Sequence, residues 1–415
     1  MRKRVVVTGL SAICPLGNDL DTAWDNLVQG KSGISRITQF DATGYDTQIA
    51  GEVKNFNPEE FGISAKQAKR MDRFTQFGVA ASMKLMEHSG FKIDDSNAED
   101  VAVHVGVGIG GLATIEAFAH KLFDSGPNRV SPFFIPMLIS NMAPGQMSIF
   151  TGARGPNLVA CSACASGLHA LGYAYTDIVL GRTRAAITGG VESTITPMGI
   201  SGFTAMKALS TRNDEPEKAS RPFDLNRDGF VAGEGAGLLF IEDLESAQAR
   251  GAAIYAEMLG YGSSGDAYHI TAPKEDGSGM IQAMRAAIKD AGLTPDDIDH
   301  INAHGTSTHH NDLGETIAIK AVFGERAYKI PVVSNKSQTG HLLGAAGGLE
   351  SLFAVLTLHN GLIPGTINYE TPDPELDLDY VTAGPRKQQV EHVLCNNFGF
   401  GGTNACVVYK RWTGK

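Results

Sequence analysis

The sequence predicts an α/β protein built from two similar halves, each with a sheet covered by helices. The first observation is a strand, a turn of small residues and a helix-period pattern over residues 157–174. The second is a weaker form of the same arrangement over residues 331–348, where a strand and a turn lead into a glycine- and alanine-rich helix. The recurrence predicts two βα units packed around a pseudo-twofold axis. We place the boundary near Gly251, which gives halves of residues 1–250 and 251–415.

The remaining elements follow from the spacing of apolar residues. In the first half we predict strands at 4–8, 101–107, 185–189 and 235–241, and helices at 21–28, 64–89 and 245–250. In the second half we predict strands from 254 onward, at 299–303, 394–397 and 406–409, the last two separated by the glycine-rich segment Phe398–Gly402.

Composition narrows the class of protein. A chain of 415 residues with 42% hydrophobic content can bury a large core. A net charge of -10 disfavours binding to nucleic acid or to an anionic membrane. No apolar run approaches the roughly 18 residues that a membrane span needs. Five cysteines, an odd number without regular spacing, indicate a reducing compartment, so we expect a cytoplasmic enzyme.

Two glycine-containing segments resemble ligand-binding motifs, but neither has all the residues that its motif requires. Gly108–Leu112 is a poor dinucleotide-binding fingerprint, because no acidic residue follows at the distance required for the ribose. Residues 224–235 begin like a calcium loop, but Gly235 stands where the bidentate carboxylate should be.

Cys164 lies in the turn between the strand and the helix of the first βα unit. A thiol at a helix N-terminus experiences the positive end of the helix dipole, which favours the nucleophilic thiolate. Two other interpretations compete: a small buried hydrophobe, or a redox or metal pair with Cys161. A structural metal site requires a second Cys or His pair, and the remaining cysteines, Cys14, Cys395 and Cys406, are scattered singly.

Polar clusters also end strands in the second half. His304 follows one predicted strand, and Lys336 with His341 follows another. Because sites in α/β proteins form at the carboxyl ends of strands, we expect these residues to converge on Cys164. Two neutral imidazoles can each donate an N–H to one developing oxyanion while a sulfur holds an acyl group. This set suits carbon–carbon bond formation through an enolate better than hydrolysis.

Four motifs together resemble the β-ketoacyl-[acyl-carrier-protein] synthase family. They are SACASG at 162–167, NAHGTST at 302–308, KSQTGH at 336–341 and NFGFGGTN at 397–404. The likeness extends from residue 4 to about 409, and the segments at 71–74, 108–112 and 266–269 resemble its type II elongating branch. The resemblance implies a thiolase-like fold, with two α/β halves in a five-layered αβαβα arrangement, and a homodimer.

The resemblance also implies residue roles. Cys164 would carry the acyl group, His304 and His341 would hold the malonyl thioester oxygen, and Lys336 would organise the site electrostatically. The other implied residues are Phe400 with Gly399 and Gly401 (oxyanion hole and gate, moving with the loop Asp266–Ala272), Thr306 and Thr308 (pantetheine), Ile109, Phe133 and Phe134 (acyl pocket, the two phenylalanines donated across a dimer interface), Glu350 and Phe398 (support), and Lys66, Lys69, Arg70 and Lys207 (docking of the acidic carrier protein).

The implied reaction is the decarboxylative condensation of an acyl group on Cys164 with malonyl-acyl carrier protein, which elongates a fatty acid. No metal or cofactor is expected, because substrates arrive on the phosphopantetheine arm of the carrier protein. The alternatives are a ketosynthase or a non-catalytic chain-length partner of a polyketide pathway, and a thiolase or initiating synthase. The non-catalytic chain-length partners typically lack the nucleophile, whereas Cys164 is present here. Thiolases use a second cysteine and initiators pair one histidine with asparagine, so the Cys-His-His set disfavours both.

Some positions depart from the family pattern. His309 and His310 follow the GTST motif where proline is frequent, Gln338 stands where methionine is common, and Asn397 where serine is common. Cys161 is an extra thiol that we predict to be buried and inert.

Overall fold

One ten-stranded sheet runs through the structure, a computed structural model that describes residues 2–414. Its strand order is β10-β9-β13-β14-β8-β1-β7-β6-β4-β5. The strands of the first half are β1 (Val5–Ile13), β4 (Val101–Gly106), β5 (Asn157–Ala160), β6 (Ala185–Glu192) and β7 (Gly235–Asp243). Those of the second are β8 (Ala256–Gly265), β9 (His300–Asn302), β10 (Val332–Val333), β13 (His392–Gly399) and β14 (Thr403–Arg411).

The sheet has an internal repeat about the β1–β8 junction. Outward from β1, the pairings with β7, β6, β4 and β5 are antiparallel, antiparallel, parallel and parallel. Outward from β8, the pairings with β14, β13, β9 and β10 follow the same pattern. Within the sheet, Val5–Val7 pairs with Ala256–Met258 and so joins the two halves. The boundary near Gly251 lies between α9 (Leu244–Ala249) and β8, and it stays a prediction.

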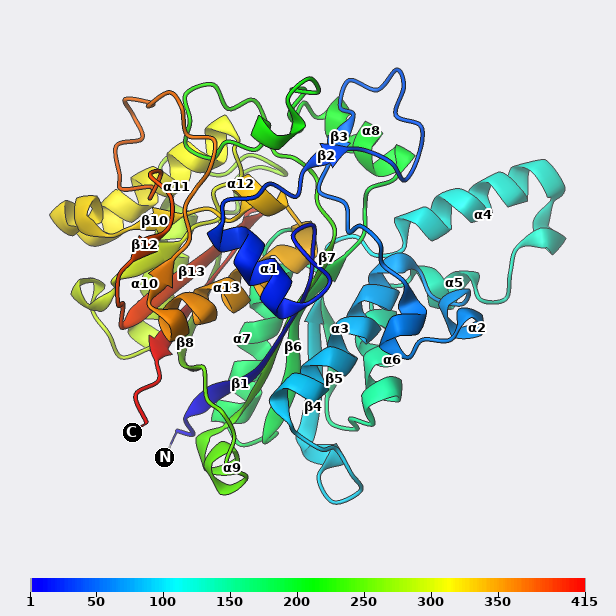
Figure 1. The fold of residues 1–415 in the computed structure, drawn as a ribbon, viewed down its shortest axis with the longest axis horizontal. Coiled ribbons are helices and arrows are strands. Elements are labelled where there is room, and N and C mark those ends of the chain that lie inside the picture. The colour runs from blue at the N-terminus through cyan, green and yellow to red at the C-terminus, as the bar shows by residue number, and fades with distance from the viewer. Residues whose placement is uncertain (1, 415) are drawn as a thin grey trace.

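Helices form three layers around this sheet (Figure 1). α7 (Ser166–Val179) and α13 (Ala346–Asn360) contact strands of both halves and form the central layer. α3 (Arg73–Ser89) and α6 (Met142–Thr151) pack on the first half, and α10 (Ser278–Asp290) packs on the second with α11 (His309–Phe323) against it. Separate hydrophobic clusters fill the central and both outer interfaces. The arrangement is the α/β fold that the sequence predicts.

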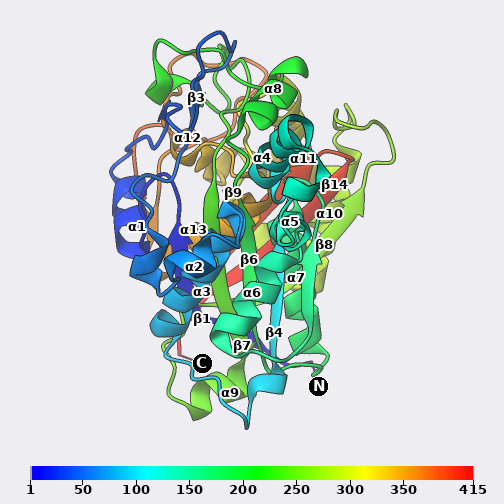
Figure 2. The ribbon, with the colours of Figure 1, turned by 90° about the vertical axis from the view of Figure 1, so that its right-hand side faces the viewer.

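The shorter elements surround these layers. The helices are α1 (Leu20–Val28), α2 (Ala65–Ala68), α4 (Leu112–Ser125), α5 (Phe134–Leu138), α8 (Pro197–Ala205) and α12 (Lys336–Thr339). Two small ribbons pair β2 (Ser35–Arg36) with β3 (Ile49–Ala50), and β11 (Leu362–Ile363) with β12 (Arg386–Lys387). Figures 1 and 2 place both termini near α9, at the end of the molecule opposite α8. Within residues 2–414, no helix has the length and apolar character needed to cross a membrane.

The central helices approach each other at glycines near their N-termini. A Cβ on Gly167 would lie 2.8 Å from the backbone nitrogen of Gly348, and a Cβ on Gly347 would lie 2.6 Å from that of Leu168. Such distances exclude any larger side chain without movement of the backbone. The small residues of both βα units therefore permit the close contact that brings their turns together.

The predicted helix over residues 64–89 is wrong as a single element. It is divided into α2 and α3 by a turn, and Asp72 there has an extended backbone (φ -68°, ψ 160°). The Asp72 side chain accepts a hydrogen bond from the backbone N–H of Phe74 at the start of α3. It also accepts bonds from the backbone N–H and the hydroxyl of Thr114. This capping competes with helix continuation, so the periodic pattern is interrupted.

Candidate active site

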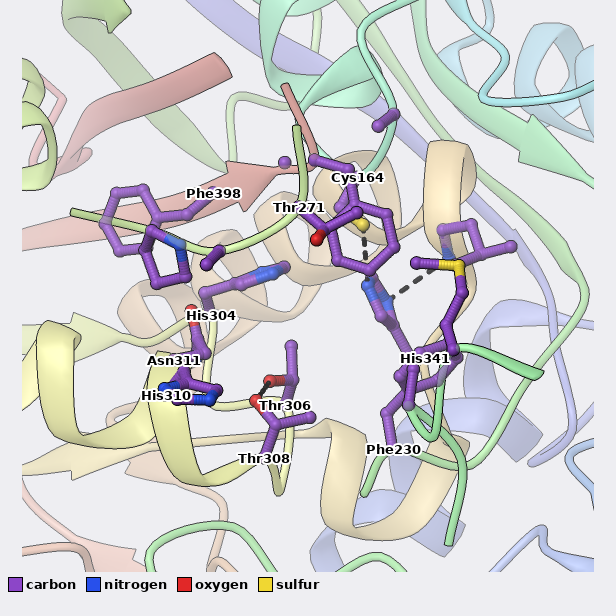
Figure 3. A pocket seen from close by; sticks show the side chains of 18 of the residues that line it. Cys164, Phe230, Thr271, His304, Thr306, Thr308, His310, Asn311, His341 and Phe398 are labelled. Carbon is purple, nitrogen blue, oxygen red and sulfur yellow. Dashed lines mark hydrogen bonds between the residues drawn. The ribbon is translucent and has the colours of Figure 1, made fainter. Parts of the chain in front are cut away.

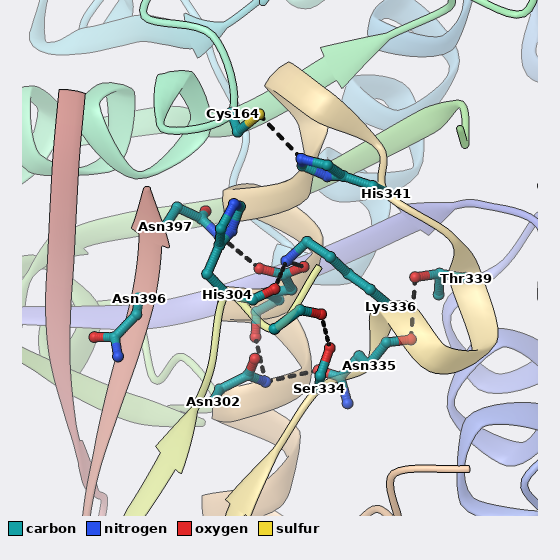
Figure 4. A network of polar contacts seen from close by, with 12 residues as sticks. Cys164, Asn302, His304, Ser334, Asn335, Lys336, Thr339, His341, Asn396 and Asn397 are labelled. Carbon is teal, nitrogen blue, oxygen red and sulfur yellow. Dashed lines mark hydrogen bonds and ion pairs between the residues drawn. The ribbon is translucent and has the colours of Figure 1, made fainter. Parts of the chain in front are cut away.

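The structure brings Cys164, His304, Lys336 and His341 together at the carboxyl ends of β5, β9 and β10 (Figures 3 and 4). The Nε2 atom of His341 lies 3.0 Å from the Sγ atom of Cys164. The His304 and His341 ring centroids are 5.2 Å apart, with an interplanar angle of 83°. The side chains of Cys164, His304 and His341 line one cavity.

A strained turn presents the Cys164 sulfur. Ala163 has a left-handed φ of +50°, which is uncommon for a residue other than glycine, and α7 begins two residues after Cys164. The backbone N–H of Phe400 lies close enough to the sulfur to lower the pKa of the thiol. Burial nevertheless raises the pKa of the Cys164 thiol to about 12, although Lys336 and the Phe400 N–H act in the opposite direction. The expected preference for a thiolate is therefore wrong, because desolvation outweighs the favourable charges.

Fixed partners set the tautomer of both imidazoles. The Asn397 side-chain amide donates to Nδ1 of His304 at 3.1 Å, and the backbone N–H of Leu343 donates to Nδ1 of His341 at 3.3 Å. An Nδ1 that accepts a hydrogen bond leaves the proton on Nε2. Burial, reinforced by the charge of Lys336, holds the pKa of both histidines well below the ordinary value. Both rings are thus neutral and can donate Nε2–H into the cavity.

A buried polar network supports these rings from below (Figure 4). The Lys336 ammonium forms an ion pair with Glu350 and donates to the backbone oxygen of His304 at 2.6 Å. The Asn397 amide also donates to Glu350, at 2.7 Å. Glu315 accepts from the backbone N–H groups of His304 and Gly305 at 2.9 and 2.8 Å. The network fixes His304 through its backbone and its ring together.

The donor set of the site argues against a metal ion. Cys164, His304 and His341 each place one potential ligand atom within 4.8 Å of the others. A histidine that binds a metal through Nε2 normally donates its other N–H to an acceptor. Here both Nδ1 atoms face N–H donors instead, so the surrounding hydrogen bonds favour Nε2–H over a metal–Nε2 bond.

The cavity has a volume of about 520 Å³ and lies beside the sulfur (Figure 3). Its lining includes the predicted residues Ile109, Thr306, Thr308, Lys207, Phe398, Gly399 and Phe400. The hydroxyl groups of Thr306 and Thr308 are 2.9 Å apart on one wall. His309 and His310, which depart from the family pattern, are exposed residues that also line it.

The glycine segment around Phe400 is bonded to the loop that was predicted to move with it. The backbone N–H of Gly401 donates to the oxygen of Ile270 at 2.8 Å, and that of Asp266 donates to the oxygen of Gly402 at 2.9 Å. Gly401 and Gly402 have φ values of +82° and +68°. Displacement of one loop would therefore break hydrogen bonds to the other.

Several predicted residues lie away from the cavity of this chain. Phe133 is half-exposed and lies under the guanidinium of Arg70, 4.4 Å from the ring centroid, while Phe134 contacts Phe118. Neither lines the described cavity. Lys66, Lys69 and Arg70 are exposed on or just after α2. This helix lies apart from α8, which ends two residues before Lys207, in both views (Figures 1 and 2).

Two departures have different outcomes. The prediction that Cys161 is buried is wrong: the residue is exposed, because the turn before α7 leaves it at the surface. Its thiol donates to the backbone oxygen of Gly108 at 3.3 Å, and partial burial with the nearby Glu192 raises its pKa. Gln338 points away from the cavity, and its amide donates to the oxygen of Leu27 in α1 at 2.6 Å.

Sequence reasoning missed two polar residues of this region. Asn397 was treated only as a departure, although its amide orients His304. Glu192, completely buried at the end of β6, was not singled out. A carboxylate that ends an otherwise small and apolar strand is the available signal, because such a group must find several donors.

The chain is similar to known proteins over nearly its whole length. Family models described as "Beta-ketoacyl synthase, N-terminal domain" and "Beta-ketoacyl synthase, C-terminal domain" match residues 2–247 and 255–370. The chain is 51% identical over 410 residues to "3-oxoacyl-[acyl-carrier-protein] synthase 2" of Staphylococcus aureus (strain N315), covering 99% of each chain.

Two solved structures are also similar. A β-ketoacyl synthase from Burkholderia phymatum STM815 has a TM-score of 0.93 and 35% identity, with 99% of this chain and 100% of that chain covered. A complex described as "type II PKS acyl-carrier protein in complex with its ketosynthase bound to the hexaketide" has a TM-score of 0.91 and 33% identity, with 100% of both chains covered.

Proposed function

The chain belongs to the β-ketoacyl synthase family, and from that premise we propose that it is an elongating 3-oxoacyl-[acyl-carrier-protein] synthase of fatty acid synthesis. It condenses an acyl group held on Cys164 with malonyl-acyl carrier protein, and the products are 3-oxoacyl-acyl carrier protein and carbon dioxide. The observation that carries the proposal is the placement of two Nε2–H donors beside one sulfur, 3.0 Å from Nε2 of His341.

The first half-reaction transfers the acyl group to Cys164. The sulfur attacks the thioester carbonyl, the bond between that carbon and the pantetheine sulfur breaks, and the thiol proton of Cys164 ends on the released pantetheine thiol. The backbone N–H of Phe400, which already faces the sulfur, and the N–H of Cys164 would stabilise the oxyanion. Burial raises the pKa of the resting thiol, which favours loss of this proton as the thioester reacts rather than beforehand.

The second half-reaction uses both histidines. Their Nε2–H groups would donate to the malonyl thioester oxygen, where negative charge develops as the carbon–carboxylate bond breaks. The resulting carbanion attacks the acyl carbonyl, and the carbon–sulfur bond to Cys164 then breaks. The departing thiolate takes one proton from solvent. Neutral imidazoles suit this role, since each presents a fixed donor without titrating in the working range.

The polar network and the threonines serve this chemistry. Lys336 would keep a positive charge beneath the forming enolate, with Glu350 as its partner. Thr306 and Thr308 would hydrogen-bond the phosphopantetheine arm along the cavity wall. We assign no metal or cofactor to the reaction.

The acyl carrier protein is the proposed partner, and Lys66, Lys69, Arg70 and Lys207 its docking residues. Their exposure and positive charge suit an acidic protein. We also propose a cytoplasmic homodimer. The free edge of the sheet at β5, together with the exposed side chains of Phe123, Ile135, Ile149 and Leu158, supports such an interface.

A polyketide ketosynthase is the alternative, because one similar solved structure is such a protein. Identity favours the fatty acid reaction, at 51% to the S. aureus relative against 33% to the polyketide enzyme. A non-catalytic chain-length partner is disfavoured by the complete Cys-His-His set.

Purified protein should be assayed with malonyl carrier protein and a series of acyl carrier proteins of increasing chain length. The unmodified protein should form 3-oxoacyl carrier protein, Cys164→Ala should form none, and Cys164→Gln should still decarboxylate malonyl carrier protein. Condensation by the Ala variant would reject the assignment.

The docking assignment needs its own test. Replacing Lys66 and Lys69 together by Glu should raise KM for carrier-bound substrate far more than KM for a free pantetheine thioester. The matched control is the exposed Lys84 on the body of α3, whose replacement by Glu should affect neither. Equal effects on both substrates would reject the docking surface.

A further inference from the structure

A buried carboxylate behind the cavity wall is not used by the proposed mechanism. Glu192 is fully buried at the carboxyl end of β6. No ion pair joins it to a basic side chain within residues 2–414. A buried charge without a cation must be satisfied by hydrogen-bond donors, so its surroundings indicate what it holds in place.

Backbone N–H groups from two separate segments surround this carboxylate. Three consecutive residues donate from one side: Gly108 at 2.7 Å, Ile109 at 3.2 Å and Gly110 at 3.2 Å. Gly344 donates from the other side at 3.1 Å. Glu192 therefore bridges the loop after β4 and the turn that follows His341.

The two segments approach too closely for any residue but glycine. A Cβ on Gly108 would lie 2.5 Å from Oε2 of Glu192, and a Cβ on Gly344 would lie 2.1 Å from the nitrogen of Gly108. The carbonyl oxygen of Gly108 is held as well, because it accepts a hydrogen bond from the Cys161 thiol. The carboxylate is thus closely enclosed by backbone, and small shifts of either segment would break its hydrogen bonds.

Both bridged segments contribute to the cavity wall beside the sulfur. Gly108 and Ile109 line the cavity on one segment, and Leu343 lines it next to Gly344 on the other. An acyl chain attached to Cys164 must pass this wall. The separation of Ile109 and Leu343 is therefore set by backbone that Glu192 ties together.

We propose that Glu192 is a positioning residue that fixes Ile109 relative to the turn after His341, and so determines which acyl chain lengths the cavity accepts. The inference rests on the proposed function, because it names a determinant of substrate specificity for that reaction. Glu192 touches no reacting atom and acts through the Gly108–Gly110 backbone. Loss of one carboxylate oxygen as an acceptor should let the wall move and admit longer chains.

The test compares acyl lengths in Glu192→Gln. The ratio of kcat/KM for a long acyl carrier substrate to that for a short one should rise by about tenfold, within the range by which apolar pockets discriminate chain length. Malonyl decarboxylation should change by less than about threefold, because the variant leaves the His304 and His341 donors in place. A uniform fall in every rate with an unchanged ratio would overturn the proposal.

Glu52→Gln is the matched control. Glu52 is also buried, and it accepts from the backbone N–H groups of Thr38 and Gln39 at 2.8 and 3.0 Å, but it lines no part of the cavity. Its replacement should leave the length ratio unchanged. A tenfold change in this control would mean that any lost buried carboxylate loosens the protein, which would overturn the specific role of Glu192.

A double-mutant cycle tests whether Glu192 acts through Ile109. In an Ile109→Gly background, Glu192→Gln should alter the length ratio by less than about twofold, because the side chain that it positions is gone. If the two substitutions changed the length ratio independently, so that their effects multiplied in the double variant, the proposal would be overturned.

A measurement on the unmodified protein covers the case in which Glu192→Gln does not fold. The amides of residues 108–110 should exchange with deuterium as slowly as those of β4. Exchange as fast as in segment 126–131 would overturn the proposal that Glu192 holds this backbone in place.

The proposed function and the inference about Glu192 fail separately. If the unmodified protein condenses no acyl chain, the proposed function fails; if it condenses and the ratio does not move in Glu192→Gln, only the inference about Glu192 fails.

Discussion

Replacing Asn397 by Asp should abolish the donor function of His304. In the protein the Asn397 amide donates to Nδ1 of His304 at 3.1 Å and to Glu350 at 2.7 Å. A carboxylate cannot donate, and it would place a second negative charge beside Glu350. It would instead accept a hydrogen bond from Nδ1–H and so favour the other neutral tautomer of the ring, which presents the Nε2 lone pair, not an N–H, to the cavity.

The loss of one donor to a developing oxyanion reduces catalysis by about 10²–10³, or roughly 3–4 kcal/mol of transition-state stabilisation. The reduction should fall on one half-reaction only. In the proposed mechanism, malonyl decarboxylation and condensation depend on both Nε2–H groups. Transfer of the acyl group to Cys164 relies there on backbone donors and should stay within about threefold of the unmodified rate.

Single-turnover assays separate these steps. Radiolabelled acyl carrier protein reports acylation of Cys164, and release of carbon dioxide from malonyl carrier protein reports decarboxylation. Asn397→Ser is the control, because a hydroxyl can still donate to Nδ1 and should retain most of the decarboxylation rate. Equal losses in both steps, or an unchanged decarboxylation rate in Asn397→Asp, would refute the tautomer argument.

Three further outcomes concern side chains in or near the site. Glu350→Ala should lower the free energy of unfolding by about 3–5 kcal/mol in urea titrations, since it leaves the fully buried Lys336 ammonium unpaired. Burial raises the pKa of Glu315 from 4.5 to about 7, so its contribution to stability is present below the lower value and is lost as pH rises through the higher one. Relative to Glu315→Gln, the unmodified protein should therefore lose about 2 kcal/mol between pH of about 5.5 and 7.5. Finally, Cys161→Ser should not slow the loss of condensing activity to iodoacetamide, because the proposed nucleophile is Cys164.

Each outcome has a contrary result. A loss below about 1 kcal/mol in Glu350→Ala would mean that Lys336 finds another partner or is neutral. A stability difference that does not vary with pH would show that Glu315 titrates alike in the folded and unfolded chains. Slower inactivation of Cys161→Ser would mean that the exposed thiol contributes to the loss of activity.

Local patterns were sufficient for the fold class and for the principal polar residues. The turn of small residues around Cys164 and its counterpart after β10 identify two βα units, because strand and helix periods and small-residue turns are properties of contiguous sequence. The ends of these units point to His304, Lys336 and His341, since parallel strands carry their functional groups at the carboxyl end. The same local reasoning failed for residues 64–89, where a bond from Thr114, distant in sequence, helps Asp72 to end one helix and begin the next.

Only the tertiary structure decided the chemical state of the site. The Nε2–H forms of His304 and His341 depend on Asn397 and on the backbone of Leu343, and the high pKa of Cys164 depends on burial by segments from the whole chain. Protonation and tautomer are set by the charges and donors within a few ångströms. Here one donor, the Leu343 N–H beside His341, is two positions away in the chain, whereas the Asn397 amide beside His304 is 93 positions away. The sequence by itself therefore predicted which polar residues meet at the cavity, while packing determined how each one is held and charged.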